Sequence, residues 1–323
     1  MEKTAIKAGL ILIDKPQGLT SHDVVRQIRK ILNQKQVGHF GTLDPLATGL
    51  LLIAVGKATR FFPYYGKMDK SYFGTIRLGW ATSTYDREGQ PLTKKVESFP
   101  SLQEVTLALQ NFRGKIKQVP PLFSAKKLRG QPLYKLAREK KESPEKIRPQ
   151  PVEIEIYRLQ LIDYQPPWLK VEIDCSSGTY IRSLAHDLGQ KLGCGAHLEN
   201  LSRTKIGHLK LSQSFSLDEV TDLARHQEFE KFVIPLEKLL PFFPKIIVNQ
   251  QEAALLSRGN IVHEKRIVKI FPAEETFSFH QPSPPAKMSH VYRAFNLEGQ
   301  LLGLVKYNPE SKSFHAFLVL KSQ

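Results

Sequence analysis

The spacing of apolar residues changes along the start of the chain, and each spacing predicts a different element. Residues 9–14 form an almost continuous apolar run of strand length, closed at residues 15–18 by a turn with proline and glycine. Thr20 or Ser21 can then cap a helix, because either side chain accepts a hydrogen bond from a free amide of the first helical turn. The apolar residues that follow recur on one helical face: Val24, Val25, Ile28, Ile31 and Leu32. We therefore predict a strand followed by an amphipathic helix.

Strand and helix signals continue beyond this helix. Residues 50–55 are all apolar and end at a glycine, and residues 72–78 are rich in strand formers and also end at a glycine. Capping boxes, in which a serine is followed three residues later by a glutamate, begin at Ser101 and Ser216. These segments predict two strands and two helix starts.

Alternation of apolar and polar residues marks a third region. Residues 152–164 and 169–175 alternate as half-buried strands do, and Pro166-Pro167 separates them. We predict an antiparallel pair. Strands and helices are interspersed up to about residue 240 without a regular strand-helix-strand repeat, so this part is expected to be a mixed α+β domain.

The pattern changes after the Pro-Phe-Phe-Pro segment at residues 241–244. A short helix is predicted at residues 250–257, stopped by a glycine, with strands around Ile267, Val291 and Leu301. A turn at residues 298–299 joins the last two strands. This part is expected to be a small β-barrel. The segment from Pro272 to Pro285 has four prolines and no periodicity, and is expected to be a long loop.

Composition and charge add a partner class to this outline. The 323 residues exceed the usual span of one core, so two domains are expected. The formal net charge of +16 favours a polyanionic partner, with nucleic acid first and an anionic membrane surface as the alternative. Residues 113–148 hold 12 Lys or Arg and 3 Glu, so 12 − 3 = +9 of that charge lies in one segment, the candidate for gripping RNA.

The ends and the cysteines bear on the compartment. The apolar run that begins near residue 10 is too short for a signal sequence or a membrane span. Cys175 and Cys194 are too few for a disulfide framework. We expect a cytoplasmic protein with no membrane association, and a monomer.

Two common kinds of ligand site are unsupported by the spacing. Gly56-Lys57 is followed by alanine and lacks the upstream glycine of a phosphate-binding loop, so no nucleotide cofactor is expected. Cys194 and His197 have a spacing seen in metal sites, with Cys175 and His186 upstream, but a second close pair is missing. We therefore expect neither a cofactor nor a metal.

The segment at residues 37–49 is the most distinctive candidate for chemistry. It places His39, a glycine turn and the carboxylate of Asp44 within six residues. Asp44 followed by Pro45 is also the usual beginning of a helix, with aspartate as the cap and proline in the first turn. Spacing alone leaves both interpretations open.

Residues 41–49, Gly-Thr-Leu-Asp-Pro-Leu-Ala-Thr-Gly, resemble the signature of the TruB family of tRNA pseudouridine synthases. The resemblance runs from about residue 9 to 207, whereas the C-terminal part resembles only loosely an RNA-binding PUA-like barrel. Further matching segments lie at residues 15–21, 69–72, 119–126, 175–182 and 196–204. The resemblance implies a pseudouridine synthase fold, a mixed β-sheet flanked by helices. It implies a catalytic domain over residues 1–240, with the basic insertion at 113–148, and a PUA-like domain over residues 245–323.

The activity implied by the resemblance is isomerisation of uridine to pseudouridine at position 55, in the T loop of tRNA. Asp44 would be the nucleophile, acting either on the pyrimidine ring or on the sugar, and the uridine would be flipped out of its stack. Nothing is oxidised and no phosphate is spent, which agrees with the absence of a cofactor motif.

Five further site residues follow from the resemblance. Arg182 would pair with Asp44 and keep it ionised by lowering its pKa, although it could also be an ordinary arginine of a first helical turn. His39 would fill the space that the flipped uridine leaves. Tyr72 would stack on the flipped base and could take part in proton transfer, and Tyr180 and Leu201 would form further walls.

Two other functions stay open at this point. The basic segment and the C-terminal module alone would also suit an RNA-binding folding factor that remodels tRNA without chemistry. A synthase of the same fold acting on another RNA is the second alternative.

Overall fold

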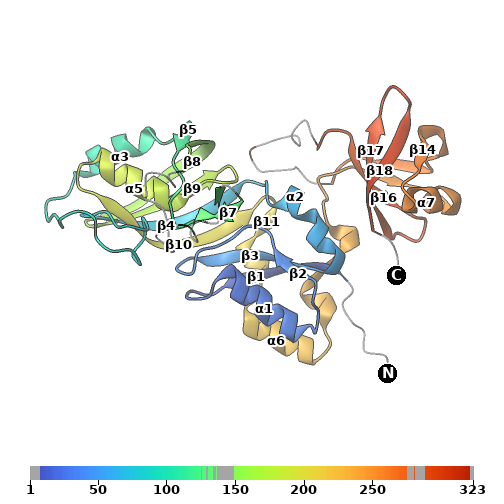
Figure 1. Cartoon of the computed structure of the whole chain (residues 1–323), viewed down its shortest axis with the longest axis horizontal. Coiled ribbons are helices and arrows are strands. Elements are labelled where there is room, and N and C mark those ends of the chain that lie inside the picture. Colours follow the sequence, from blue (N-terminus) through green and yellow to red (C-terminus); the bar gives the residue numbers. More distant parts are fainter. Residues whose placement is uncertain are drawn as a thin grey trace.

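A computed structural model of the chain describes residues 8–124, 126–128, 130–133, 136, 149–274, 280 and 288–320. Within them the strands form a ten-stranded sheet, a six-stranded sheet and a two-stranded pair, with helices packed on the larger two (Figure 1). The predicted α+β class, a mixed sheet flanked by helices, is confirmed.

The ten-stranded sheet has a main path of eight strands and two additional strands. In spatial order the path runs through β12 (Val233–Pro235), β1 (Gly9–Lys15), β3 (Thr48–Val55), β10 (Ala196–Ile206), β4 (Lys70–Leu78), β9 (Trp168–Cys175), β8 (Val152–Gln165) and β5 (Gly114–Gln118). The additional strands are β2 (Val37–His39), beside β3, and β11 (Leu209–Lys210), beside β10. β8 and β9 pair antiparallel, as predicted.

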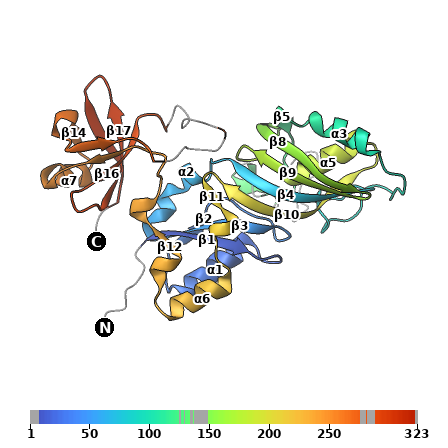
Figure 2. The same cartoon turned by 180° about the vertical axis from the view of Figure 1, so that it is seen from behind.

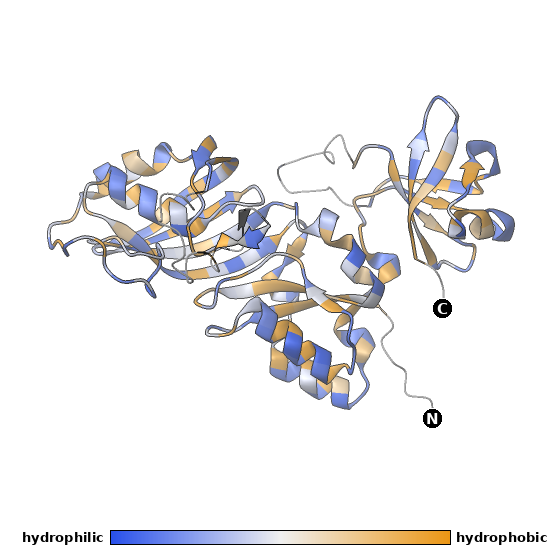
Figure 3. Cartoon of the chain, in the orientation of Figure 1, coloured by the Kyte–Doolittle hydropathy of each residue, from blue (hydrophilic) through white to orange (hydrophobic). Residues whose placement is uncertain are grey.

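Two pairs of helices cover the two halves of this sheet. α1 (Ser21–Ile31) and α6 (Leu217–Arg225) pack beside β1 and β3, whereas α3 (Leu102–Gln110) and α5 (Ile181–Lys191) pack on the β4, β8 and β9 half (Figures 1 and 2). α1 and α6 each carry both hydrophobic and hydrophilic residues (Figure 3). Val24, Val25 and Ile28 of α1 are fully buried, and burial of each such side chain contributes roughly 1.5–3 kcal/mol.

The predicted helix starts agree with the structure. Thr20, one of the two candidates, caps α1 through a capping box that it shares with Asp23. Ser101 and Ser216 cap α3 and α6 in the same way, each with its glutamate three residues later. Local sequence therefore fixes where these helices begin.

The junction between the halves of the sheet is the feature that matters for function. β10 lies between β3 and β4, parallel to β3 and antiparallel to β4. The register places Ser202 beside Thr48 and Arg203 beside Gly49. The end of the 41–49 motif is thereby fixed against a strand that follows it by some 150 positions in the sequence.

The C-terminal sheet curls into a half-barrel (Figure 1). Its strands are, in spatial order, β14 (Ile261–His263), β18 (Ser313–Val319), β17 (Leu301–Asn308), β16 (Val291–Phe295), β13 (Lys245–Ile247) and β15 (Lys269–Phe271), with α7 (Gln250–Ser257) packed against it. The predicted helix and the β16–β17 hairpin are confirmed. The strand predicted around Ile267 is misplaced, because Ile267 follows a short 3-10 turn and the strand begins two residues later. Of the predicted loop from Pro272 to Pro285, only residues 272–274 and 280 lie within the described part.

The remaining short elements lie in the connections between the strands and helices. They are the 3-10 turns η1 (Gly56–Phe61), η2 (Leu211–Gln213), η3 (Phe229–Lys231), η4 (Leu236–Lys238) and η5 (Glu264–Arg266), the helix α2 (Phe62–Tyr65), and the two-stranded pair of β6 (Lys127–Leu128) and β7 (Gln131–Pro132). Aromatic rings join α2 to the segment that leads into the half-barrel. Tyr64 packs edge-on against Phe243 with ring centroids 5.3 Å apart, and Tyr65 against Phe242 at 6.1 Å.

Candidate active site

Asp44 lies in the loop that connects β2 to β3. The Ala47 amide donates to the Asp44 carbonyl at 3.1 Å, which closes a single turn, and β3 begins directly afterwards at Thr48. No helix follows Asp44. The helix-cap interpretation of Asp44-Pro45 is therefore wrong, and the carboxylate is free of a capping duty.

A buried arginine holds this loop from behind. The Arg203 guanidinium is 1% exposed and donates to three backbone carbonyls: Leu50 at 2.8 Å, Gly41 at 3.1 Å and Thr42 at 3.4 Å. A buried charge is costly without partners, and these carbonyls supply them. The same contacts fix the path of the chain on both sides of Asp44.

Gly49 shows how closely the loop and β10 are packed. Its φ is +95°, a left-handed conformation that glycine adopts readily. A Cβ at this position would lie 2.4 Å from the Arg203 carbonyl oxygen, well inside van der Waals contact. The glycine that ends the 41–49 motif is thus required both by its backbone conformation and by its neighbour.

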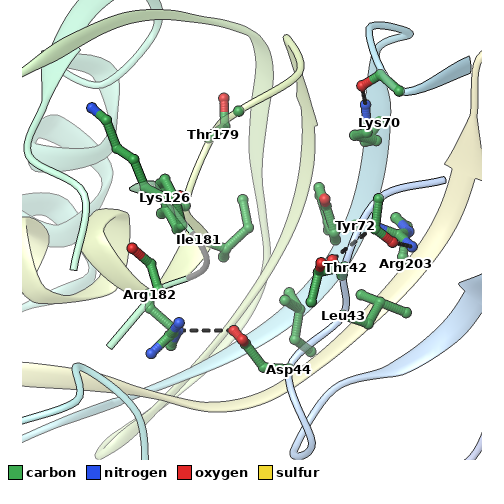
Figure 4. A pocket seen from close by; sticks show the side chains of 16 residues that line it. Thr42, Leu43, Asp44, Lys70, Tyr72, Lys126, Thr179, Ile181, Arg182 and Arg203 are labelled. Atoms are coloured by element: carbon green, nitrogen blue, oxygen red, sulfur yellow. Dashed lines mark hydrogen bonds and ion pairs between the residues drawn. The ribbon is translucent and has the colours of Figure 1, made fainter. Parts of the chain in front are cut away.

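A cavity of about 390 Å³ opens between the Asp44 loop, β4, β10 and the start of α5. Five of the six predicted site residues line it: Asp44, Tyr72, Tyr180, Arg182 and Leu201. Figure 4 shows the Asp44 and Arg182 side chains pointing toward each other, with Tyr72 and Arg203 on the opposite side. His39 is not among the lining residues. It ends β2, which leads into the Asp44 loop.

The Arg182 guanidinium contacts three separate segments of the chain. Its Nε lies 2.9 Å from Asp44 Oδ2, and its Nη1 lies 3.3 Å from Asp86 Oδ2. It also donates to the carbonyls of Thr84 at 3.1 Å and Phe123 at 2.9 Å. With a side chain that is 5% exposed, Arg182 is a fixed and buried cation, and an ordinary first-turn arginine would lie in solvent.

Two opposing effects act on the pKa of Asp44. Burial in the cavity raises the pKa of Asp44 above the usual range of aspartate, and the Arg182 guanidinium opposes this shift without overcoming it. The nearby Asp86 carboxylate adds to the upward shift of the Asp44 pKa. Arg182 thus lowers the pKa of Asp44, as the resemblance implies, but the net pKa is raised because burial of the carboxylate is the larger effect.

Two tyrosines on opposite walls are buried to different degrees. Burial raises the pKa of Tyr72 to about 12, with the Arg203 guanidinium opposing the shift, so the ring carries a neutral hydroxyl near neutral pH. Tyr180 is the N-cap residue of α5 but makes no side-chain capping bond, and burial raises its pKa too. Gln118 fixes the Tyr180 backbone by accepting from its amide at 2.8 Å and donating to its carbonyl at 3.0 Å.

Two functional candidates escaped prediction from sequence. Asp86 shares Arg182 with Asp44, yet a single acidic residue in a loop carries no spacing signal. Lys70 lines the cavity and is 6% exposed, and burial lowers its pKa to about 7. Its ammonium donates to the Gly66 carbonyl at 2.9 Å. Lys70 lies inside one of the matching segments, two residues before the predicted site residue Tyr72. This position was the sequence signal that could have identified it.

Two models of known protein families match this chain. A model described as TruB family pseudouridylate synthase (N terminal domain) matches residues 29–181, and one described as tRNA pseudouridylate synthase B C-terminal domain matches residues 182–241. The chain belongs to the TruB family.

Relatives named tRNA pseudouridine synthase B match over most of their length. The one from Solibacter usitatus is 44% identical over 78% of this chain and 84% of its own length. The one from Clostridium acetobutylicum is 38% identical over 94% of this chain and 96% of its own. These identities extend well beyond the 41–49 motif.

Solved structures share the fold at lower identity. A structure of an H/ACA RNP bound to a substrate RNA containing 2'-deoxyuridine contains a chain that superposes with a TM-score of 0.70 at 23% identity, covering 98% of this chain and 86% of its own. A Cbf5-Nop10-Gar1 complex gives a TM-score of 0.68 at 24% identity, covering 99% and 85%. At this identity the likeness shows that the TruB chain and these proteins have a common fold.

The basic segment of this TruB family member is only partly described. Lys126 lines the cavity and donates to the Gln150 carbonyl at 3.4 Å. The side chains of Lys127 and Arg129, and nearly all of residues 134–148, lie outside the described residues. The prediction that residues 113–148 grip RNA therefore stays a prediction.

In the described part of the chain, no three His, Cys, Asp or Glu side chains are grouped closely enough to hold a metal ion. Cys175 and Cys194 are buried free thiols. Among the helices of the described ranges, none is long and apolar enough to cross a membrane.

Proposed function

We propose that this protein converts uridine to pseudouridine at position 55, in the T loop of tRNA, with Asp44 as the nucleophile. The observation that carries the proposal is the ion pair of Asp44 with the buried Arg182 at the edge of a cavity with an aromatic wall. The names of the relatives, tRNA pseudouridine synthase B, support tRNA as the substrate.

The cavity suits a single extruded nucleotide. Its volume of about 390 Å³ lies at the lower end of the range for small-ligand sites, and paired bases of a folded RNA could not enter it. The Tyr72 ring and Leu201, which line the cavity with Asp44, offer apolar surfaces on which a flipped base can stack. His39 ends the strand that enters the Asp44 loop, from where we propose that it fills the vacated place in the RNA.

The reaction balances without a cofactor. The bond from C1′ of the ribose to N1 of uracil breaks, the base rotates, and C1′ bonds to C5, while the proton on C5 is lost and N1 gains one. Asp44 forms a temporary bond either to the pyrimidine ring or to C1′ and is released at the end. Both routes need an ionised carboxylate, which Arg182 favours against the effect of burial.

Substitution of Asp44 by asparagine tests the proposal. Asp44→Asn should abolish pseudouridine formation in a T-arm transcript while leaving the affinity for tRNA nearly unchanged, because the amide keeps the size of the carboxylate but is not a nucleophile. Product is measured by mapping pseudouridine in the RNA, and affinity by filter binding.

A matched control is Asp163→Asn. Asp163 lies on β8 and pairs with Lys170 on the surface, at 3.1 Å. This control should retain full activity. Turnover by Asp44→Asn at the rate of the control would remove Asp44 from the role of nucleophile.

A further inference from the structure

A strained tyrosine precedes the acidic residue that shares Arg182 with Asp44. Tyr85 has a φ of +64°, in the left-handed region, where a bulky side chain is disfavoured because its Cβ approaches the backbone. Such strain persists only where the surroundings impose it, and it is enriched near functional sites. Asp86, the next residue, accepts hydrogen bonds at its Oδ1 from the Thr84 hydroxyl and, at 3.1 Å, from the Glu88 amide.

An aromatic contact holds Tyr85 against α5. Its ring stacks on the His186 imidazole with centroids 3.9 Å apart and an interplanar angle of 17°. Burial lowers the pKa of His186, so the imidazole is neutral near neutral pH. In the described part of the chain, His186 Nδ1 is buried without a hydrogen-bond partner. His186 is thus held at this place by its ring rather than by a polar bond of that nitrogen.

The Tyr85–His186 stack and the Asp86–Arg182 ion pair join the same loop to the same helix. His186 follows Arg182 by four residues on α5, so the two side chains lie on the same face of the helix. Tyr85 and Asp86 are adjacent in the loop, and Arg182 Nη1 lies 3.3 Å from Asp86 Oδ2. Two neighbouring contacts therefore bridge the loop and the helix, one aromatic and one ionic.

Two backbone hydrogen bonds anchor Tyr85 in the loop. The Tyr85 carbonyl accepts from the Leu198 amide of β10 at 2.9 Å, and the Tyr85 amide donates to the Thr82 carbonyl at 3.2 Å. These bonds hold the position of residue 85 beside the sheet. The ring contact with α5 sets how the loop meets the helix that carries Arg182.

We infer that Tyr85 and His186 are positioning residues, whose stack holds the loop that carries Asp86 against α5 and thereby keeps Arg182 oriented toward Asp44. The inference rests on the proposed function, since Asp44 is taken as the nucleophile. Neither residue lines the cavity, so neither is expected to touch the RNA base. Their removal should slow the chemical step and leave binding unchanged.

Substitutions at position 85 distinguish the effect of the ring from the effect of the backbone conformation. Tyr85→Gly adopts the same φ without strain but removes the stack, and we expect kcat to fall by about tenfold with KM nearly unchanged. Tyr85→Phe keeps the ring and should retain the original kcat. His186→Ala should behave like Tyr85→Gly, and His186→Phe should restore the rate. Equal rates for Tyr85→Gly and the unaltered protein would overturn the inference.

A double-mutant cycle tests whether Tyr85 acts through Asp86. In an Asp86→Asn background, measured by single turnover, Tyr85→Gly should cost less than about twofold, because the ion pair that Tyr85 positions is already absent. Full additivity would overturn the inference. Gln227→Gly is the matched control: Gln227 also has a positive φ, of 61°, at the end of α6, and the change should leave kcat unaltered.

An observation that does not depend on activity separates this inference from the proposed function. The side-chain Nε resonance of Arg182 should shift or broaden in Tyr85→Gly and stay in place in Tyr85→Phe. An unmoved resonance in Tyr85→Gly would overturn the inference even in an active enzyme. Absence of pseudouridine formation by the unaltered protein would instead overturn the proposed function.

Discussion

At the scale of single residues, the site places a carboxylate where burial disfavours its ionised form. Asp44 must be ionised to act as a nucleophile, yet burial in the cavity raises its pKa. Arg182 offsets part of that effect at 2.9 Å, and is itself shared with Asp86. The arrangement holds the Asp44 carboxylate in place beside a fixed cation, as the proposed nucleophile requires.

The raised pKa of Asp44 leads to a pH prediction. A raised pKa means that protonation begins at a higher pH than for an exposed aspartate, so the rate should fall on acidification with a midpoint above that of ordinary aspartate. Arg182→Met removes the main opposing charge, which should raise the pKa of Asp44 further and move the midpoint to still higher pH. Single-turnover rates of pseudouridine formation across the acidic range measure both midpoints.

Arg158→Met is the control for this experiment. Arg158 lies on β8, is about half exposed and pairs with Glu172 at 2.9 Å. Its removal should leave the acid midpoint in place. A midpoint that is the same in Arg182→Met and in the unaltered protein would mean that Arg182 does not set the pKa of Asp44.

At the scale of elements, the site depends on how strands meet. β3 carries the end of the Asp44 loop, and β10 lies directly beside it. Arg203 of β10 donates to carbonyls of the loop and of β3. The opposite wall comes from the start of α5, which delivers Tyr180 and Arg182. Three elements from distant parts of the sequence therefore converge on one carboxylate.

Two glycines allow the contact between loop and β10 to be tested. Gly49 and Gly18 both have positive φ, of +95° and +89°, but a Cβ at Gly49 would meet the Arg203 backbone at 2.4 Å whereas one at Gly18 would meet nothing within 4 Å. Gly18→Ala should cost about 1–2 kcal/mol of unfolding free energy from conformation alone. Gly49→Ala should cost at least about twice as much, and should lower activity as well.

Denaturant unfolding followed by circular dichroism gives both free energies of unfolding. Equal losses of stability for the two variants would show that the Asp44 loop can move away from β10 at no cost, contrary to the close packing at Gly49.

At the scale of the whole molecule, the positive charge is concentrated in one segment. The formal net charge is +16, and 12 of the basic residues lie within residues 113–148. Lys126 brings one of them to the rim of the cavity. The half-barrel joins the rest through the aromatic packing of Tyr64 and Tyr65 on Phe243 and Phe242. We expect binding of tRNA to be dominated by phosphate contacts outside the cavity.

The basic segment can be tested by neutralisation. Replacing Lys126, Lys127 and Arg129 together by glutamine should weaken tRNA binding and reduce the slope of log affinity against log salt by up to about 2–3, roughly one for each cation that no longer meets a phosphate. Binding titrations at several salt concentrations measure the slope. An unchanged slope would remove this segment from the RNA interface. Replacing Lys265, Lys269 and Lys312 of the half-barrel instead shows how much the C-terminal module contributes.

Much of the fold could be predicted from the sequence because local signals suffice for local structure. The capping boxes at Ser101 and Ser216, the apolar run of β3 and the alternation in β8 and β9 each depend on neighbours within a few residues. The misplaced strand at Ile267 shows the limit of such signals, since a short 3-10 turn shifts the element by two residues and leaves no clear mark in the apolar pattern.

The sequence by itself determined the chemical groups: Asp44 in a distinctive nine-residue motif, Arg182 at a helix start, and aromatic residues at 72 and 180. Only the tertiary structure decided between a helix cap and a free carboxylate, because Asp44-Pro45 is compatible with both until β3 is seen to begin at Thr48. It also decided the direction of the Asp44 pKa and the role of Asp86, since burial and the approach of two carboxylates to one guanidinium depend on distances between segments that the sequence leaves far apart.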